Sequence, residues 1–373
     1  VPGSNLVFLI DVSGSMRQDN RLPLVKTALS MLLEELRSED LVSLVVYSGR
    51  VEVLLEATPA SKKARILSTL NGLYADGSTA GGQALRMAYD VAESSFIKGG
   101  NNRIIMCSDG DFNVGETSLE AMQQLVEDKR RKGVYLTVLG FGMGNYKDDR
   151  LELIANKGNG NYGYIDNIQE ARKLLIHEFA GTLYTLATDV KVQIEFNPAR
   201  VKAYRLIGYE NRRLNPEDFN NDAKDAGEMG AGHAVTALYE IIPAGSDAPI
   251  PGGIDPLRYQ PNPRSVRPDN SAELLTVKAR YKEGVGQRSV KFELAVPGNV
   301  IPLSRTSQDF RFAAAVAEFG LLLSGSPYRS NASYDNVLTG ALKGKGSDVE
   351  GYRAEFINLV RTAQSLDKLS MRR

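Results

Sequence analysis

The chain has 373 residues, of which 42% are hydrophobic, and this length suffices for two domains that each bury a core. Its 45 basic and 45 acidic side chains balance, so no global field would hold a polyanion, which argues against nucleic acid as the main partner. The single Cys107 cannot form an internal disulfide, and no apolar run approaches the roughly 18 residues that span a bilayer.

Apolar runs alternate with segments of helical period from residue 6 to about residue 181. The predicted strands are residues 6–12, 41–47, 51–55, 103–107, 134–140 and 162–165. The predicted helices are residues 22–36, 62–73, 82–95, 119–132 and 168–181. Only three residues join the second and third strands, so we expect an antiparallel hairpin there. The pattern predicts an α/β domain over residues 1–185, with a doubly wound, mostly parallel six-stranded sheet flanked by helices.

The pattern changes in residues 186–373. Polar and apolar residues alternate in residues 189–196, 201–209, 272–282 and 288–296, which is typical of antiparallel strands with one wet face. Six prolines between residues 245 and 268 predict a long exposed loop. Residues 310–323, 336–342 and 349–369 have helical period. We therefore expect a C-terminal α+β domain with antiparallel strands followed by terminal helices.

Oxygen-bearing side chains follow two of the predicted strands. Asp11, Ser13 and Ser15 leave the first strand at alternate positions, Thr79 lies in a glycine-rich loop, and Asp109 ends the fourth strand. Open α/β sheets bind ligands at this edge. Oxygen donors without nearby Cys or His suit magnesium, with manganese or calcium as alternatives, and argue against zinc. For the first three residues alone, a turn capping the next helix is the alternative interpretation.

These motifs resemble the metal-ion-dependent adhesion site (MIDAS) of von Willebrand factor type A domains. The resemblance covers residues 4 to 181 and rests on Asp-x-Ser-x-Ser, the later threonine and the later Ser-Asp-Gly, in that order. It implies that a partner protein presents an Asp or Glu that completes the shell of a Mg²⁺ ion. It also implies the five protein ligands of that ion, which are Asp11, Ser13, Ser15, Thr79 and Asp109.

The second half resembles a narrower bacterial group of type A proteins. Residues 206–212 and 230–240 recur there in a C-terminal domain of unassigned role. Members of this group usually carry an N-terminal segment and an export or lipoprotein signal, which this chain, opening at Val1, does not show. The resemblance implies a periplasmic or cell-envelope location, with the cytoplasm as the alternative.

The leading hypothesis is a non-enzymatic, metal-dependent protein-interaction module without a catalytic residue; its partner and oligomeric state stay open. One alternative is an adaptor or co-chaperone for an ATPase, which would use the same site. The other is a magnesium-dependent phosphatase with Asp11 as nucleophile. Such enzymes need a second carboxylic acid two residues later, where this chain has Ser13, and a hydroxyl cannot act as the general acid at neutral pH.

Overall fold

The computed structural model describes most of the chain. The described residues are 2–77, 81–110, 118–142, 148–178, 185–209, 213–224, 226–248, 271–283 and 287–370. Contacts divide the chain into two units. The first comprises residues 1–190, 224–234 and 281–290, and the second comprises residues 191–223, 235–280 and 291–373.

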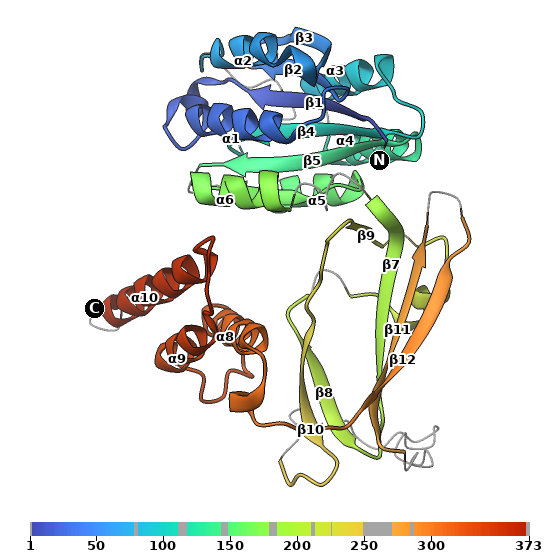
Figure 1. Ribbon diagram of the computed structural model, residues 1–373, viewed down its shortest axis with the longest axis vertical. Helices are drawn as coiled ribbons and strands as arrows, with labels where there is room; N and C mark the ends of the chain where they lie inside the picture. The colour runs from blue at the N-terminus through green and yellow to red at the C-terminus, as the bar shows by residue number, and fades with distance from the viewer. Residues whose placement is uncertain are drawn as a thin grey trace. The chain divides into compact units, whose positions relative to one another are not determined.

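The first unit is built on one sheet with strand order β3-β2-β1-β4-β5-β6 (Figure 1). Its strands are β1 (Ser4–Asp11), β2 (Leu41–Tyr47), β3 (Val51–Pro59), β4 (Asn101–Ser108), β5 (Val134–Phe141) and β6 (Tyr162–Ile165). Only β3 is antiparallel to its neighbour, which confirms the predicted hairpin. From β1 the chain adds β2 and β3 on one side, and it then crosses back to add β4, β5 and β6 on the other side. The strand order therefore reverses between β1 and β4. This is the switch point at which doubly wound folds bind ligands.

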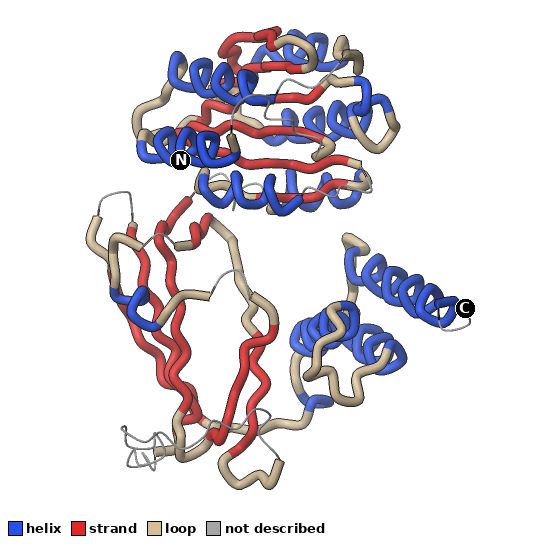
Figure 2. Tube along the Cα trace, turned by 180° about the vertical axis from the view of Figure 1, so that it is seen from behind, coloured by secondary structure: helices blue, strands red, loops and turns tan. Residues whose placement is uncertain are grey.

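Helices cover both faces of this sheet, as Figure 2 shows from behind. On one face lie α1 (Leu22–Glu35), α2 (Lys63–Asn71) and α6 (Ile168–Arg172), continued by the π turn η3 (Lys173–His177). On the other face lie α3 (Gly81–Ser94), α4 (Leu119–Arg131) and α5 (Asp148–Lys157). Short 3-10 turns, η1 (Gly14–Arg17) and η2 (Ala60–Lys62), precede α1 and α2. The predicted fold class is confirmed.

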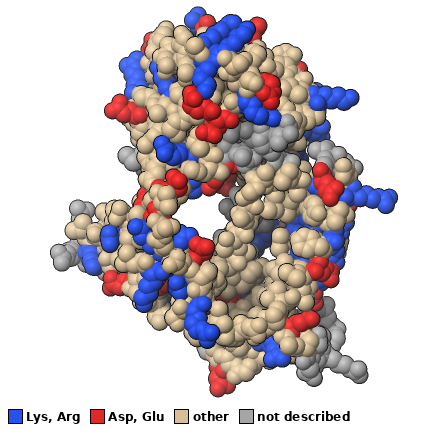
Figure 3. All heavy atoms as spheres, viewed as in Figure 1, with Lys and Arg blue, Asp and Glu red and all other residues tan. Residues whose placement is uncertain are grey.

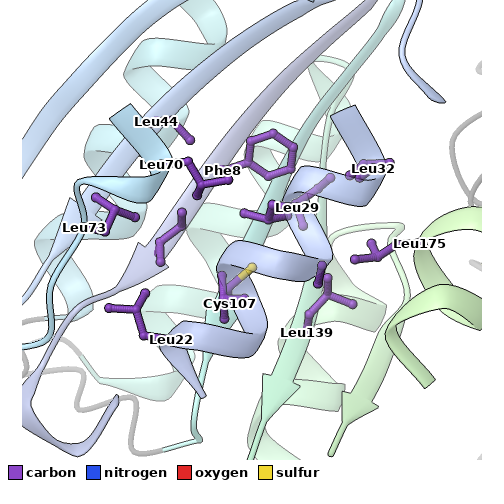
Figure 4. Packing of buried hydrophobic residues seen from close by; sticks show 14 of the residues in the cluster. Phe8, Leu22, Leu29, Leu32, Leu44, Leu70, Leu73, Cys107, Leu139 and Leu175 are labelled. Atoms are coloured by element: carbon purple, nitrogen blue, oxygen red, sulfur yellow. The ribbon is translucent and has the colours of Figure 1, made fainter. Parts of the chain in front are cut away.

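Alternate residues of β1 enter the two cores. Phe8 packs against α1 with Leu29 and Leu32, as Figure 4 shows, whereas Leu9 belongs to the cluster on the opposite face. Both faces of the strand are therefore apolar, as expected for a buried parallel strand. Cys107 is fully buried in the first cluster, and burial raises the pKa of its thiol.

Helix α5 was not predicted. It is short, and its buried apolar residues are only Leu151, Ile154 and Ala155. Three buried apolar positions give too little periodicity to separate a surface helix from a connecting loop.

The remaining strands form two sheets. They are β7 (Thr185–Phe196), β8 (Val201–Ile207), β9 (Gly227–Gly230), β10 (Leu238–Pro243), β11 (Glu273–Lys282) and β12 (Val290–Pro297). One sheet has the order β12-β11-β7-β9, and β10 pairs antiparallel with β8 in the other. The sequence did not predict β9 or β10, because β9 has glycine at both ends and β10 lacks a clear alternation. Most of the predicted proline-rich loop, residues 249–268, lies outside the described residues.

Three helices end the chain, as predicted: α8 (Gln308–Leu323), α9 (Tyr334–Gly344) and α10 (Tyr352–Ser370). Their small core contains Ala315, Val337, Ala341, Ile357 and Val360. The 3-10 turns η5 (Pro216–Asn220) and η7 (Leu303–Arg305) complete the described elements. Within the described ranges, no helix is both long and apolar enough to cross a membrane. On the face drawn in Figure 3, Lys and Arg are interspersed with Asp and Glu.

Candidate metal site

The first motif lies at the carboxyl end of β1, beside the ends of β2 and β4. Asp11 Oδ1 accepts a hydrogen bond from the Ser13 amide at 2.8 Å, and the hydroxyls of Ser13 and Ser15 are bonded to each other at 3.1 Å. Asp11 and Ser13 are buried. Asp11 Oδ2 is also buried, and no described atom donates a well-formed hydrogen bond to it. A buried carboxylate oxygen without a hydrogen-bond donor destabilises the folded protein unless another group binds it.

The charge of Asp11 is poorly accommodated by the protein alone. Burial raises the pKa of its carboxyl group to about 6, and the negative charge of Asp109 contributes in the same direction. Hydrogen bonding from Ser13 and the nearby Tyr47 hydroxyl opposes this rise. A divalent cation would relieve both effects, because it would compensate the buried charge and the repulsion between the two carboxylates.

Tyr47 is a neighbour of the site that the sequence analysis missed. It ends β2 in register with Asp11 and is fully buried. Burial, followed by the negative charge of Asp11, raises the pKa of its phenol well above the ordinary value, so the hydroxyl stays neutral. The sequence signal that could have found Tyr47 is its place at the end of a predicted strand, at the sheet edge where such folds bind ligands.

The second predicted loop is tied to the first by main-chain hydrogen bonds. The Asp76 amide donates to the Val12 carbonyl at 2.7 Å, and the Gly14 amide donates to the Gly77 carbonyl at 3.0 Å. Gly77 has φ +81°, a conformation that favours glycine. Thr79, the predicted ligand from this loop, lies outside the described residues.

Asp109 follows β4 and meets an arginine that the sequence analysis did not single out. Arg21, the residue before α1, donates from Nη1 to Asp109 Oδ2 and to the Ser15 carbonyl, both at 2.7 Å. The Arg21 side chain is 17% exposed and that of Asp109 is 3% exposed. The arginine therefore joins the first and third motifs within a largely buried site. No spacing in the sequence could have predicted this contact over 88 positions.

The donor chemistry of the site fits a hard cation. In the part of the chain that the structure describes, no three His, Cys, Asp or Glu side chains gather as a metal cluster. The site instead combines two carboxylates with serine hydroxyls, the oxygen set suited to magnesium, manganese or calcium. Asp11 Oδ2, which accepts no well-formed hydrogen bond from a described atom, gives such an ion a point of attachment.

Gly142, just after β5, determines how closely the chain approaches Arg21. Its φ is +105°, and a Cβ atom there would lie 2.8 Å from Arg21 Nε. We expect Gly142→Ala to lower the free energy of unfolding by about 2–4 kcal/mol, through backbone strain and displacement of the arginine. Gly99→Ala is the control, since Gly99 also has a positive φ but nothing within 4 Å. Urea unfolding of both variants checks this, and equal losses would contradict a contact with Arg21.

A doubly wound sheet with Asp-x-Ser-x-Ser and Ser-Asp-Gly at its switch point defines the fold of the von Willebrand factor type A domain. Residues 5–176 match the family model of that domain, and residues 181–366 match the model described as the C-terminal part of the uncharacterized protein YfbK. The chain thus consists of a von Willebrand factor type A domain followed by a YfbK C-terminal domain.

Individual relatives agree with this assignment. The chain is 44% identical over 370 residues to the uncharacterized protein YfbK of Escherichia coli strain K12, an alignment that covers 99% of this chain and 63% of that protein. It is 30% identical over 220 residues to human inter-alpha-trypsin inhibitor heavy chain H3, covering 55% of this chain and 22% of that protein. The chain therefore spans less than two thirds of either relative's length.

One solved structure resembles the fold over most of the chain. It is a von Willebrand factor type A protein from Catenulispora acidiphila, with a TM-score of 0.50, 15% identity, and coverage of 93% of this chain and 81% of that chain. At this identity the likeness supports the fold alone. The class to which the first domain belongs is one of protein-interaction modules.

Proposed function

We propose that this protein binds a partner protein through a divalent cation, preferably Mg²⁺, held at the end of β1 and β4. Asp11, Ser13, Ser15, Thr79 and Asp109 would hold the ion. The observation that carries the proposal is Asp11 Oδ2, a buried carboxylate oxygen without a well-formed hydrogen bond beside two serine hydroxyls. Mn²⁺ and Ca²⁺ have the same preference for oxygen donors and are the alternatives.

The proposed partner presents an Asp or Glu side chain. Serine and threonine hydroxyls are neutral ligands, so they leave much of the ion's positive charge uncompensated. A carboxylate from another protein can supply that charge, and the ion then bridges the two molecules. Surrounding loops would add specificity without changing this basic attraction.

Titration of chelator-treated protein with MgCl₂ or MnCl₂ tests the proposal by calorimetry. We expect saturable binding at one site, and we expect Ser13→Ala to weaken it at least tenfold, because loss of a ligand hydroxyl corresponds to about 1.4 kcal/mol or more. Ser43→Ala is the matched control, since Ser43 is equally buried but lies within β2, opposite Val7 in the register. Equal affinity in the parent and Ser13→Ala would contradict the proposed site.

The geometry favours this role over phosphoryl transfer. Asp11 ends the first strand, as the nucleophile of a phosphatase would, but the residue two positions later is Ser13 and its hydroxyl bonds Ser15. The proposal is therefore non-enzymatic. Turnover of p-nitrophenyl phosphate by the magnesium-loaded protein, abolished by Asp11→Asn, would overturn it.

An envelope location completes the proposal, on the strength of the resemblance to exported bacterial type A proteins. Cell fractionation with the full-length gene product is the test, and recovery of the protein with the cytoplasm would contradict it.

A further inference from the structure

The ion pair between Arg21 and Asp109 differs from the ordinary surface bridges of this protein. Its Nη1–Oδ2 distance is 2.7 Å and both partners are largely withdrawn from water. Arg50, near the same edge of the sheet, is the opposite case: its side chain is 84% exposed and its bridge to Glu52 is 3.2 Å long. Solvent screening weakens the exposed pair of Arg50 and Glu52. The pair of Arg21 and Asp109 is screened less, because it lies largely buried within the candidate metal site.

Arg21 is held in this place from several sides. Besides Asp109, its Nη1 binds the Ser15 carbonyl. A Cβ atom at position 142 would lie 2.8 Å from its Nε and 3.1 Å from its Cγ, so Gly142 leaves the space that the side chain occupies. The guanidinium cannot leave without loss of its two hydrogen bonds, one of them to a buried carboxylate. It is therefore a resident positive charge beside the oxygen atoms that would hold a cation.

This charge changes what the site prefers. Asp11 and Asp109 contribute two negative charges and Arg21 one positive charge, so the three side chains sum to one negative charge when all are ionised. With a divalent cation the total becomes one positive charge. Without Arg21 it would be zero, and an incoming carboxylate would lose much of its electrostatic attraction.

We propose that Arg21 determines the ligand specificity of the site, by competing with the divalent cation for Asp109 and thereby keeping the metal-loaded site positive towards a carboxylate. This inference deepens the proposed function and rests on it. It has two consequences of opposite sign: removal of Arg21 strengthens binding of the cation and weakens binding of the carboxylate. A purely structural role for Arg21 would weaken both.

The first measurement is calorimetric titration of MnCl₂ into the chelator-treated full chain. We expect Arg21→Gln to bind Mn²⁺ about tenfold or more tightly than the parent, because a unit charge a few ångströms away is removed and Asp109 is released. Arg50→Gln removes the same formal charge near the same edge without touching the site, and should change the affinity less than about twofold. Arg21→Lys retains the charge and should stay within about threefold of the parent.

The second measurement uses acetate as the carboxylate probe. Bound Mn²⁺ broadens the methyl proton resonance of acetate that reaches the ion, so the broadening per bound Mn²⁺ reports carboxylate binding. We expect the broadening to fall at least threefold in Arg21→Gln and to remain at the parental level in Arg50→Gln and Arg21→Lys.

The outcomes separate this inference from the proposed function. If the parent binds Mn²⁺ and loses it in Ser13→Ala, but Arg21→Gln binds equally or more weakly, the proposed function stands and the role of Arg21 is refuted. Tighter Mn²⁺ binding without loss of acetate broadening also refutes it. If Mn²⁺ binds only after removal of Arg21, the parent never carries the ion and the arginine together, and both the proposed function and the role of Arg21 are refuted. If neither protein binds Mn²⁺, both proposals fail.

Discussion

Asp11→Asn should stabilise the metal-free protein at neutral pH. The pKa of this carboxyl is raised from 3.8 to about 6 in the folded chain, mainly by burial, so the ionised form disfavours folding above pH 6. A rise of about two pKa units corresponds to about 3 kcal/mol, which a neutral amide of the same shape would recover. Asparagine can still accept the Ser13 amide bond through its own oxygen. Calorimetric unfolding at pH 7.5 in EDTA is the measurement.

The sign of the pH dependence follows from the same shift. The folded parent binds a proton more tightly than the unfolded chain does, so its stability increases as the pH falls from about 6 towards 4. Asp11→Asn should lack this contribution. Magnesium reverses the order at neutral pH, since ligand at 1,000 times its dissociation constant stabilises the parent by about 4.1 kcal/mol, more than the roughly 3 kcal/mol gained by the variant, and leaves the variant unchanged. A metal-free Asp11→Asn protein less stable than the parent at pH 7.5 would contradict the argument.

Asp40 provides a control with the opposite expectation. It is also buried, and burial by itself would raise its pKa, but hydrogen bonds from Arg37 and the Ser4 amide outweigh burial and lower the pKa below its usual value. The ionised form is thus the stable one. Asp40→Asn should lower the free energy of unfolding at pH 7.5, in contrast to Asp11→Asn, and its effect should diminish as the pH falls below 4.

The sequence predicted the first sheet well because each strand carries its own signal. The apolar run from Leu6 to Ile10 predicts a strand buried on both faces from its own residues alone. That the first and third motifs lie at one edge was likewise predictable, since Asp11 and Asp109 each follow a strand and parallel strands place their carboxyl ends at one edge. The position of Thr79 stays a prediction. The Asp11–Ser13 contact is local and follows directly from that pattern.

The parts that were missed depend on contacts between distant segments. Arg21 reaches Asp109 only because α1 packs on the sheet beside β4, and an arginine before a helix has no distinctive local pattern. Tyr47 resembles any aromatic strand residue until the strand order places it beside Asp11. The short strand β10 is defined by its pairing with β8 rather than by its own residues. Local propensity cannot encode such pairings.

Gly160→Ala should be the most destabilising of the substitutions considered. Gly160 precedes β6, and a Cβ atom there would lie 1.8 Å from the Leu136 carbonyl oxygen and 2.8 Å from the Thr137 amide nitrogen. Both atoms belong to the backbone of β5 and cannot turn aside as a side chain could. The chain from residue 158 to residue 161 would have to move away from β5. This movement would break the bonds from the Leu136 amide to Gly158 and from the Val138 amide to Asn161.

We expect a loss of more than about 3 kcal/mol, since two buried main-chain bonds and the packing of α5 are lost together. Gly320→Ala is the control, because Gly320 lies within α8 with nothing within 4 Å of its Cβ position; alanine there should leave stability unchanged or raise it by up to about 1 kcal/mol. The chain has no tryptophan, so urea unfolding is followed by circular dichroism. A loss below about 1 kcal/mol in Gly160→Ala would contradict the close approach of residues 158–161 to β5.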